Sequence, residues 1–145
     1  MTLDDAIILA SVVQVEGTIS EMNKIARVFI NRMNADMPLE AEPTVNYLRV
    51  RDGKEPQLWM NADELQEYAG SPYNTYYFTG LPPGPINSPG AVAIEAVLWP
   101  ATERTWPGAE RYLFFTATGT GTTDFSFTYE EHAEKTSKYK EAYEG

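Results

Sequence analysis

The sequence of 145 residues contains no cysteine and a single histidine, His132. The absence of cysteine excludes disulfide bonds and thiolate chemistry, and it leaves the redox compartment open. One histidine argues against a zinc site, which normally uses several His or Cys ligands. We therefore expect no metal site.

Basic residues are scarce, because 11 Lys and Arg stand against 21 Asp and Glu and give a net charge of −10. An acidic surface repels the phosphates of nucleic acids and the headgroups of anionic membranes. Nucleic acid is therefore not an expected partner. Neutral or locally basic substrates fit this charge better.

Long apolar runs are also missing, since no stretch approaches the roughly 18 to 20 residues that a transmembrane helix needs. The Met1 end carries Asp4 and Asp5 without a basic segment, so it does not read as a signal peptide. With 43% hydrophobic residues, the chain can still bury a core of ordinary size. We expect a single domain over residues 1–145 and no membrane insertion by this chain.

The most apolar stretch runs from Ile7 to Gly17 and reads I-I-L-A-S-V-V-Q-V-E-G. Its length favours a helix over a strand. Thr2 followed three residues later by Asp5 has the spacing of a helix cap, and Gly17 offers a left-handed residue at which the helix can end. The stretch is predicted to be a buried helix that ends on one carboxylate, Glu16.

Glu16 is predicted to lie on the apolar side of this helix, near Leu9 and Val13, because each helical residue advances by about 100°. Partial loss of water and the negative end of the helix dipole would both raise its pKa. A carboxylic acid that stays protonated suits a general acid, such as the group that protonates the leaving oxygen in glycoside cleavage. The alternative is an ordinary Glu at a frayed helix end, in water or paired with Arg27 or Arg32.

The remaining sequence predicts further helices and one β-hairpin from its capping residues, turn residues and periodicity. The predicted helices are Glu21–Ala35 after Ser20, Asn61–Tyr68, Gly90–Leu98 after Ser88-Pro89, and a polar helix from Thr128 to Tyr143; Thr44–Val50 is either helical or extended. The predicted strands are Arg111–Thr118 and Asp124–Phe127, joined by a Gly119-Thr120-Gly121 turn. His132 falls among Glu and Lys residues of the last helix and is predicted to be solvated.

The segment Ser71–Pro89 is rich in Pro, Gly and Tyr and is predicted to be a long ordered loop. Ordered loops of this length often carry function. Its tyrosines and Asn74 would suit stacking on and hydrogen bonding to sugar rings. They would equally suit a structural loop whose tyrosines pack, and the residues alone leave both interpretations open.

Seven short motifs occur along the chain in a fixed order. They are L-A-S-V-V-Q-V-E (Leu9–Glu16), V-F-I-N-R (Val28–Arg32), E-P-T-V (Glu42–Val45), Y-N-T-Y (Tyr73–Tyr76), G-L-P-P-G-P-I (Gly80–Ile86), S-P-G (Ser88–Gly90) and Y-L-F-F (Tyr112–Phe115). In this order the chain resembles the catalytic domain of the MltG/YceG-like endolytic murein transglycosylases. Y-N-T-Y followed closely by G-L-P-P-G-P-I is the most specific part of the resemblance.

The resemblance implies an enzyme, a lytic transglycosylase that cleaves the bond between N-acetylmuramic acid and N-acetylglucosamine in peptidoglycan and leaves a 1,6-anhydro-muramyl end. The family's catalytic acid is the second acidic residue of a segment like V-E-K-E-T, and that position matches Glu16. A transglycosylase of this type needs only one carboxylate, and no cofactor is expected. The implied fold is α+β, a mostly helical lysozyme-like catalytic domain with a small antiparallel sheet.

The resemblance also implies which residues line the glycan cleft, with Asn74 as the first candidate for a substrate hydrogen bond. The substrate-binding candidates are Asn31, Glu42, Thr44, Tyr73, Asn74, Thr75 and Tyr76.

Four positions depart from the family pattern. Members commonly carry an acidic residue in place of Gln14, Thr in place of Gly17, Asp in place of Glu42, and His near Asp124. The membrane anchor and LysM-like region that usually precede this domain are not expected in residues 1–145. The chain is then either a shortened version of a longer protein or a phage or mobile-element lysin that other proteins deliver to the cell wall.

Two rival hypotheses remain. The first is a muramidase-type hydrolase, which would need a second carboxylate such as Glu42 or Glu21 across the cleft. The second is a noncatalytic glycan-binding or virion structural module that keeps the cleft without turnover.

Overall fold

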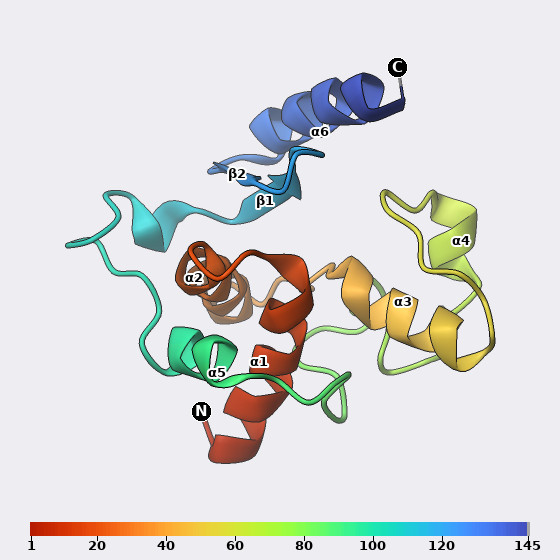
Figure 1. Ribbon diagram of the computed structural model, residues 1–145, viewed down its shortest axis with the longest axis horizontal. Coiled ribbons are helices and arrows are strands. Elements are labelled where there is room, and N and C mark those ends of the chain that lie inside the picture. Colours follow the sequence, from red (N-terminus) through yellow and green to blue (C-terminus); the bar gives the residue numbers. More distant parts are fainter. Residues whose placement is uncertain (145) are drawn as a thin grey trace.

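The computed structural model describes residues 1–144 and contains six α-helices, one 3₁₀ helix and two strands within that range (Figure 1). The elements are α1 (Leu3–Glu16), α2 (Met22–Asn34), α3 (Glu42–Arg51), α4 (Ala62–Gln66), α5 (Ala91–Leu98), η1 (Ala109–Arg111), β1 (Phe114–Ala117), β2 (Thr123–Ser126) and α6 (Tyr129–Glu144). The α+β class is confirmed. In residues 1–144, no helix has both the length and the apolar character to cross a bilayer.

Helix α1 lies in the middle of the protein and packs against both α2 and α5 (Figure 1). It starts as predicted, since Thr2 and Asp5 form a capping box with each other's backbone. Leu9, Val12 and Val13 are fully buried in the main core. Burying side chains of this size contributes about 1.5–3 kcal/mol each, so the core fixes the position of the helix end that carries the acid.

The prediction of a left-handed Gly17 is wrong, because this residue has an extended backbone with φ −140° and ψ 170°. A Cβ at this position would overlap with Cδ1 of Ile25 on α2, so a larger residue here requires the end of that side chain to move. The chain thus leaves α1 by passing close against the next helix.

Two predicted caps are also wrong. Ser20 does not cap α2, whose N-cap is Glu21, because the chain enters this helix through a turn closed by Thr18. Ser88 does not cap α5 either, whose N-cap is Gly90. The amide of Gly90 donates to the side-chain oxygen of Gln14 at 2.8 Å, so α1 supplies the partner that a local serine was expected to supply.

The segment Thr44–Val50, for which periodicity left helical and extended structure open, is helical and belongs to α3. It begins at Glu42 and carries Pro43 in its first turn, where a fixed φ favours helix and no N–H is lost. Asn61 forms the predicted capping box of α4, although that helix ends at Gln66 and not at Tyr68.

The two strands form the predicted antiparallel hairpin, with Phe115 opposite Phe125. Its turn contains Gly119 and Gly121, both with positive φ. The first strand is shorter than predicted, since Arg111 belongs to η1 and β1 begins only at Phe114, whereas the second keeps its predicted length with its bounds shifted by one residue. Helix α6 follows β2 and packs on the hairpin, with Thr128 accepting the amide of Glu131 at 3.3 Å.

The segment Ser71–Pro89 contains no helix or strand, as predicted, and α1 holds one end of it. The hydroxyl of buried Ser11 accepts the amide of Ile86 at 3.0 Å and donates to the carbonyl of Ile8 at 2.6 Å. The side-chain nitrogen of Asn87 donates to the backbone carbonyl of Ser11 at 2.7 Å. A polar residue in the core helix thus satisfies backbone that lacks a ladder of its own.

Substituting Ser11→Ala should lower the free energy of unfolding by about 1–3 kcal/mol, because the amide of the half-buried Ile86 would lose its acceptor beside the core. Urea denaturation measures the change. The control is Ser137→Ala on the exposed side of α6, which should stay within about 0.5 kcal/mol of the parent. Equal stabilities for the two variants would show that this hydrogen bond does not anchor the loop.

Candidate active site

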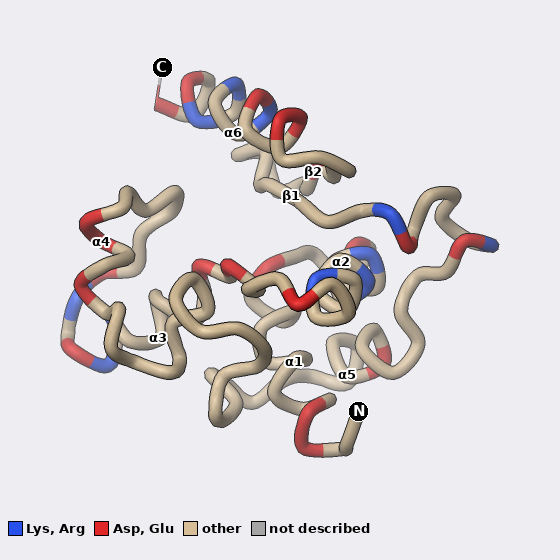
Figure 2. The backbone as a smooth tube through the Cα atoms, turned by 180° about the vertical axis from the view of Figure 1, so that it is seen from behind, with Lys and Arg blue, Asp and Glu red and all other residues tan. Residues whose placement is uncertain are grey.

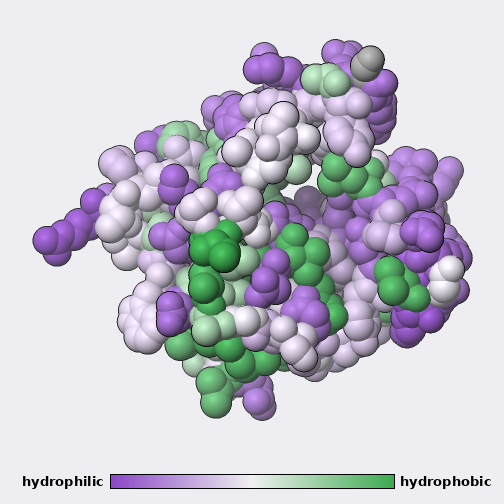
Figure 3. Space-filling model, in the orientation of Figure 1, coloured by the Kyte–Doolittle hydropathy of each residue, from purple (hydrophilic) through white to green (hydrophobic). Residues whose placement is uncertain are grey.

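A cleft of about 720 Å³ lies beside the end of α1, between α3 with the 56–60 segment on one side and the hairpin with α6 on the other. Its size is that of a small-molecule or oligosaccharide site. Figure 3 shows the hollow beneath α6. The polar and aromatic residues that line the cleft are Glu16, Arg32, Glu40, Glu42, Asn46, Gln57, Trp59, Tyr76, Phe114, Phe115, Thr116, His132, Thr136 and Lys140.

Glu16, the last residue of α1, reaches this cleft with a half-buried side chain. Within residues 1–144 its carboxyl makes neither a hydrogen bond nor an ion pair. Arg27 donates instead to the carbonyl of Ala101 at 2.6 Å, and Arg32 pairs with Glu40. The alternative of a salt-bridged Glu16 at a frayed helix end therefore does not describe this structure.

Burial, and to a smaller extent the nearby carboxylate of Glu42, raises the pKa of Glu16 from its ordinary 4.5 to about 8. Removal from water disfavours the charged form, and a like charge disfavours it again. The direction agrees with the expectation from the sequence. Glu16 therefore carries its proton at neutral pH.

Both carboxylate oxygens of Glu42, the first residue of α3, accept hydrogen bonds from backbone amides. They accept the amide of Trp59 at 3.0 Å and the amide of Met60 at 2.6 Å. Trp59 has a positive φ of 55°, a conformation that costs energy for a residue with a side chain. Glu42 thus holds one wall of the cleft in a strained shape, and burial raises its own pKa.

Tyr76 is the member of the Y-N-T-Y motif that lines the cleft. Burial raises the pKa of its hydroxyl well above the ordinary value of 10.0, and the carboxylates of Glu42, Glu16 and Glu40 add to the effect. The hydroxyl stays protonated and can donate a hydrogen bond close to Glu16.

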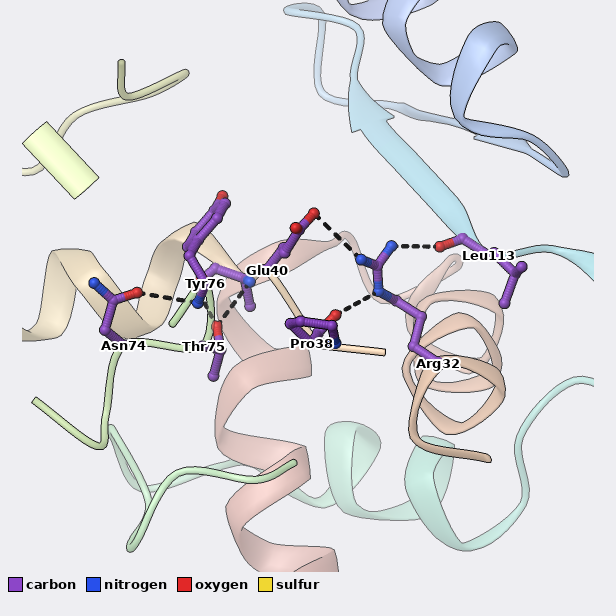
Figure 4. A network of polar contacts seen from close by, with 8 residues as sticks. Arg32, Pro38, Glu40, Asn74, Thr75, Tyr76 and Leu113 are labelled. Carbon is purple, nitrogen blue, oxygen red and sulfur yellow. Dashed lines mark hydrogen bonds and ion pairs between the residues drawn. The ribbon is translucent and has the colours of Figure 1, made fainter. Parts of the chain in front are cut away.

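Asn74 and Thr75 support Tyr76 from behind and do not line the cleft (Figure 4). The amide oxygen of Asn74 accepts the backbone N–H of Tyr76 at 3.0 Å, and its nitrogen donates to the carbonyl of Leu65 at 2.9 Å. Asn74 is fully buried, so the structure does not bring it within reach of a substrate.

Thr44 lies in the same buried layer. Its hydroxyl donates to the carbonyl of Ala41 at 2.7 Å and lies 2.9 Å from the hydroxyl of Thr75, which accepts the amide of Ala41 at 2.9 Å. The two threonines join the start of α3 to the Y-N-T-Y loop, and neither side chain opens to the cleft.

Two further candidates lie elsewhere. Tyr73 stacks on Tyr47 with 5.1 Å between ring centroids, outside the cleft. The amide of buried Asn31 donates to the carbonyls of Ala109 and Tyr112, both at 2.8 Å, and so ties α2 to η1. Of the predicted site residues, the structure brings together Glu16, Glu42 and Tyr76.

Arg32 lines the cleft and crosslinks three segments around it (Figure 4). Its guanidinium donates to the carbonyl of Pro38 at 2.9 Å, to the carbonyl of Leu113 at 2.6 Å and to Glu40 at 3.2 Å. It also lies over the ring of Phe114, 5.1 Å from the centroid. Arg32 therefore fixes Glu40 and the start of β1 relative to α2.

Helix α6 contributes three cleft residues, and the prediction of a solvated His132 is wrong. His132, Thr136 and Lys140 are spaced by four residues and line the cleft from one side of the helix. At the far end of α6, Tyr143 contacts Trp59 edge to face at 5.3 Å, so the helix spans the cleft. The charges of both signs along α6 (Figure 2) gave no apolar stripe, and only the four-residue spacing could have indicated a shared face.

Two acidic residues considered from the sequence lie outside the cleft. Glu21 accepts the amide of Thr123 at 3.2 Å and links α2 to the hairpin. Asp124 accepts hydrogen bonds from Tyr139 at 2.6 Å and from Lys135 at 3.0 Å, and so joins β2 to α6. In residues 1–144, no three His, Cys, Asp or Glu side chains are grouped so as to hold a metal ion.

Comparison with known proteins finds close relatives. The sequence is 37% identical to the endolytic murein transglycosylase of Bacillus subtilis (strain 168) over 132 residues, which covers 90% of this chain and 33% of the relative. It is 38% identical to the endolytic murein transglycosylase of Streptococcus pneumoniae serotype 2 (strain D39) over 97 residues, which covers 66% of this chain and 17% of the relative. The chain thus corresponds to a third or less of the length of these relatives.

A crystal structure of a putative yceG-like protein from Listeria monocytogenes has the same fold. It superposes with a TM-score of 0.76 at 37% sequence identity, over 92% of this chain and 40% of that one. The sequence model of the YceG-like family matches residues 1–138, nearly the whole chain. The resemblance inferred from the seven motifs is confirmed, and this chain belongs to the YceG-like family.

Proposed function

We propose that this chain is the catalytic part of a peptidoglycan lytic transglycosylase. It cleaves the bond between N-acetylmuramic acid and N-acetylglucosamine, with Glu16 as general acid and then base, and leaves a 1,6-anhydro end. The names of the two bacterial relatives support the reaction class. The substrate is a glycan strand of the cell wall, and no cofactor is required.

The observation that carries this proposal is the state of the three carboxyl groups in the cleft. Glu16 is protonated and has no partner in residues 1–144. Glu40 is paired with Arg32, and Glu42 is bonded to two backbone amides. The cleft therefore offers one acid that is free to act, which is what a transglycosylase requires.

In the first step, Glu16 donates its proton to the glycosidic oxygen and the bond to the anomeric carbon breaks. The sugar that remains develops positive charge, as in other glycoside cleavages. The carboxylate of Glu42 lies near enough to raise the pKa of Glu16, and the same negative charge favours a developing cation.

In the second step, the Glu16 carboxylate takes the proton of the sugar's own 6-hydroxyl while that oxygen bonds to the anomeric carbon. The acid is regenerated and no water is consumed. A hydrolase would instead need a second carboxylate to activate water, and Glu42 is already occupied by the amides of Trp59 and Met60.

Glu16→Gln should lower the rate of glycan cleavage by about 10²–10⁴-fold, because the amide keeps the shape but cannot donate the proton. Purified peptidoglycan is incubated with the parent and the variant, and soluble fragments are identified by mass spectrometry. The parent should release fragments with 1,6-anhydro-muramic ends. Glu130→Gln, an exposed carboxylate of α6 outside the cleft, is the matched control and should match the parent.

The other outcomes of this experiment would each favour one of the two rival hypotheses. Reducing ends in place of anhydro ends would establish a muramidase-type hydrolase, with Glu42 as the second carboxylate to test. No products from either protein, while both still bind glycan, would leave a noncatalytic binding module.

The pH dependence of kcat/KM should follow the protonation of Glu16 in the free enzyme. Because the reactive form carries the proton and the pKa is about 8, activity should stay constant from neutral pH to near that value and then fall about tenfold per pH unit. Initial rates on soluble glycan between neutral and alkaline pH measure the profile. A decline that begins near 4.5, the ordinary pKa of Glu, would contradict a buried acid.

Stability should also depend on Glu16. Its folded pKa of about 8 exceeds the ordinary 4.5, so the folded state binds the proton more tightly than the unfolded state, and stability falls as pH rises through this window. Glu16→Gln removes the effect. The variant should match the parent at pH 4.5 and melt at a higher temperature at pH 8, as measured by thermal unfolding. Identical melting temperatures at both pH values would mean that Glu16 is not desolvated.

A further inference from the structure

Helix α6 presents a row of polar side chains to the cleft that the proposed chemistry does not use. His132, Thr136 and Lys140 lie one above the other at four-residue spacing and line the cleft across from Glu16 and α3. Lys140 is close enough to lower the pKa of Glu42 by its charge, which places the row opposite the acidic wall.

Two of these side chains carry polar atoms without a protein partner. In residues 1–144, three buried side-chain atoms lack a hydrogen bond, and two of them are Nδ1 of His132 and Oγ1 of Thr136, one helical turn apart. The third, Oδ1 of Asn87, lies away from the cleft. Both atoms are covered by protein, so neither touches a ligand directly. Unsatisfied buried polar groups are costly and few in native proteins, so two neighbours beside one cleft single out this face of α6.

The ring of His132 is held in place by apolar contacts. It stacks on Phe114 with 5.2 Å between centroids and 25° between planes. Phe114 is itself fixed by Arg32 over its ring and by Tyr129 at its edge. A group that is held by packing alone keeps its hydrogen-bonding capacity for a ligand.

The two ring nitrogens of His132 differ. Nδ1 is covered by protein, whereas Nε2 makes no hydrogen bond in residues 1–144 and is not covered. Nδ1 has no acceptor within reach, so leaving it as a bare lone pair costs less free energy than placing an N–H there. The proton of the neutral ring is therefore on Nε2. Burial, together with the charges of Arg32 and Lys135, lowers the pKa of the imidazole, so the ring is neutral near pH 7.

Building on the proposed function, we propose that His132 is a substrate-binding residue. Its Nε2–H donates a hydrogen bond to a hydroxyl or N-acetyl oxygen of the glycan strand, on the side of the cleft opposite Glu16. The ring of Phe114 beside His132 supplies an apolar surface for the face of the same sugar.

Binding is measured in the Glu16→Gln background, where the glycan is not consumed. Isothermal titration with a soluble tetrasaccharide of alternating N-acetylglucosamine and N-acetylmuramic acid compares this protein with the same protein carrying His132→Phe. Phe keeps the stack on Phe114 and removes the donor, so the Kd should rise about 3- to 10-fold. In the active enzyme the same change should raise KM and leave kcat nearly unaltered.

Two variants serve as controls. His132→Gln retains an N–H donor and should recover part of the affinity, whereas Glu134→Gln, on an exposed position of the same helix, should leave the Kd unchanged. The melting temperature of His132→Phe, measured by thermal unfolding, separates the loss of the donor from an effect on folding.

An unchanged Kd and KM for His132→Phe would overturn the role of His132 in binding, and α6 would then be a structural cover. Failure of the Glu16→Gln protein itself to bind the tetrasaccharide would overturn the glycan assignment of the cleft as a whole. The first result leaves the transglycosylase proposal standing and the second does not, so the two failures are distinguishable.

Discussion

The burial of the Glu16 carboxyl at the end of α1 is the constraint on which the rest of this structure depends. Among the described residues 1–144 no side chain forms an ion pair with it, so its removal from water disfavours the charged form and stabilises the proton on it. Such a site persists only if the helix that carries it is held firmly. The packing of Leu9, Val12 and Val13 against α2 and α5 provides this hold, and Gly17 allows the chain to turn away tightly against Ile25.

Around this helix end, the cleft is shaped by side chains bonded to backbone groups of its loops. The segments before α3, around residue 59 and along Tyr73–Tyr76 have no ladder of their own, so their buried amides and carbonyls need other partners. Glu42, Thr75 and Asn74 supply them. Several residues whose chemistry suggests ligand binding are thus used to hold Tyr76 and the cleft wall in place.

The two sides of the cleft differ in character. The wall of α1 and α3 carries the acidic groups and the hydroxyl of Tyr76, whereas the hairpin and α6 carry Phe114, His132 and Lys140. A sugar chain presents apolar ring faces as well as hydroxyl and amide groups, and it needs both kinds of surface. Because the two walls belong to segments about a hundred residues apart in sequence, as Glu16 and Phe114 are, the site exists only when the hairpin folds back over α2.

The sequence by itself determined the elements whose signals are local. Capping boxes set the starts of α1 and α4, glycines set the hairpin turn, and an apolar run ending in Glu16 indicated a buried acid. Seven ordered motifs were sufficient to identify the family.

Only the tertiary structure decided the features that depend on distant partners. Gln14 replaces Ser88 at the start of α5, Asn74 and Thr44 turn to backbone groups, and His132 reaches the cleft from a helix that reads as solvated. Local patterns report capping and periodicity, whereas a hydrogen-bond partner 76 residues away, as between Gln14 and Gly90, is fixed only by packing.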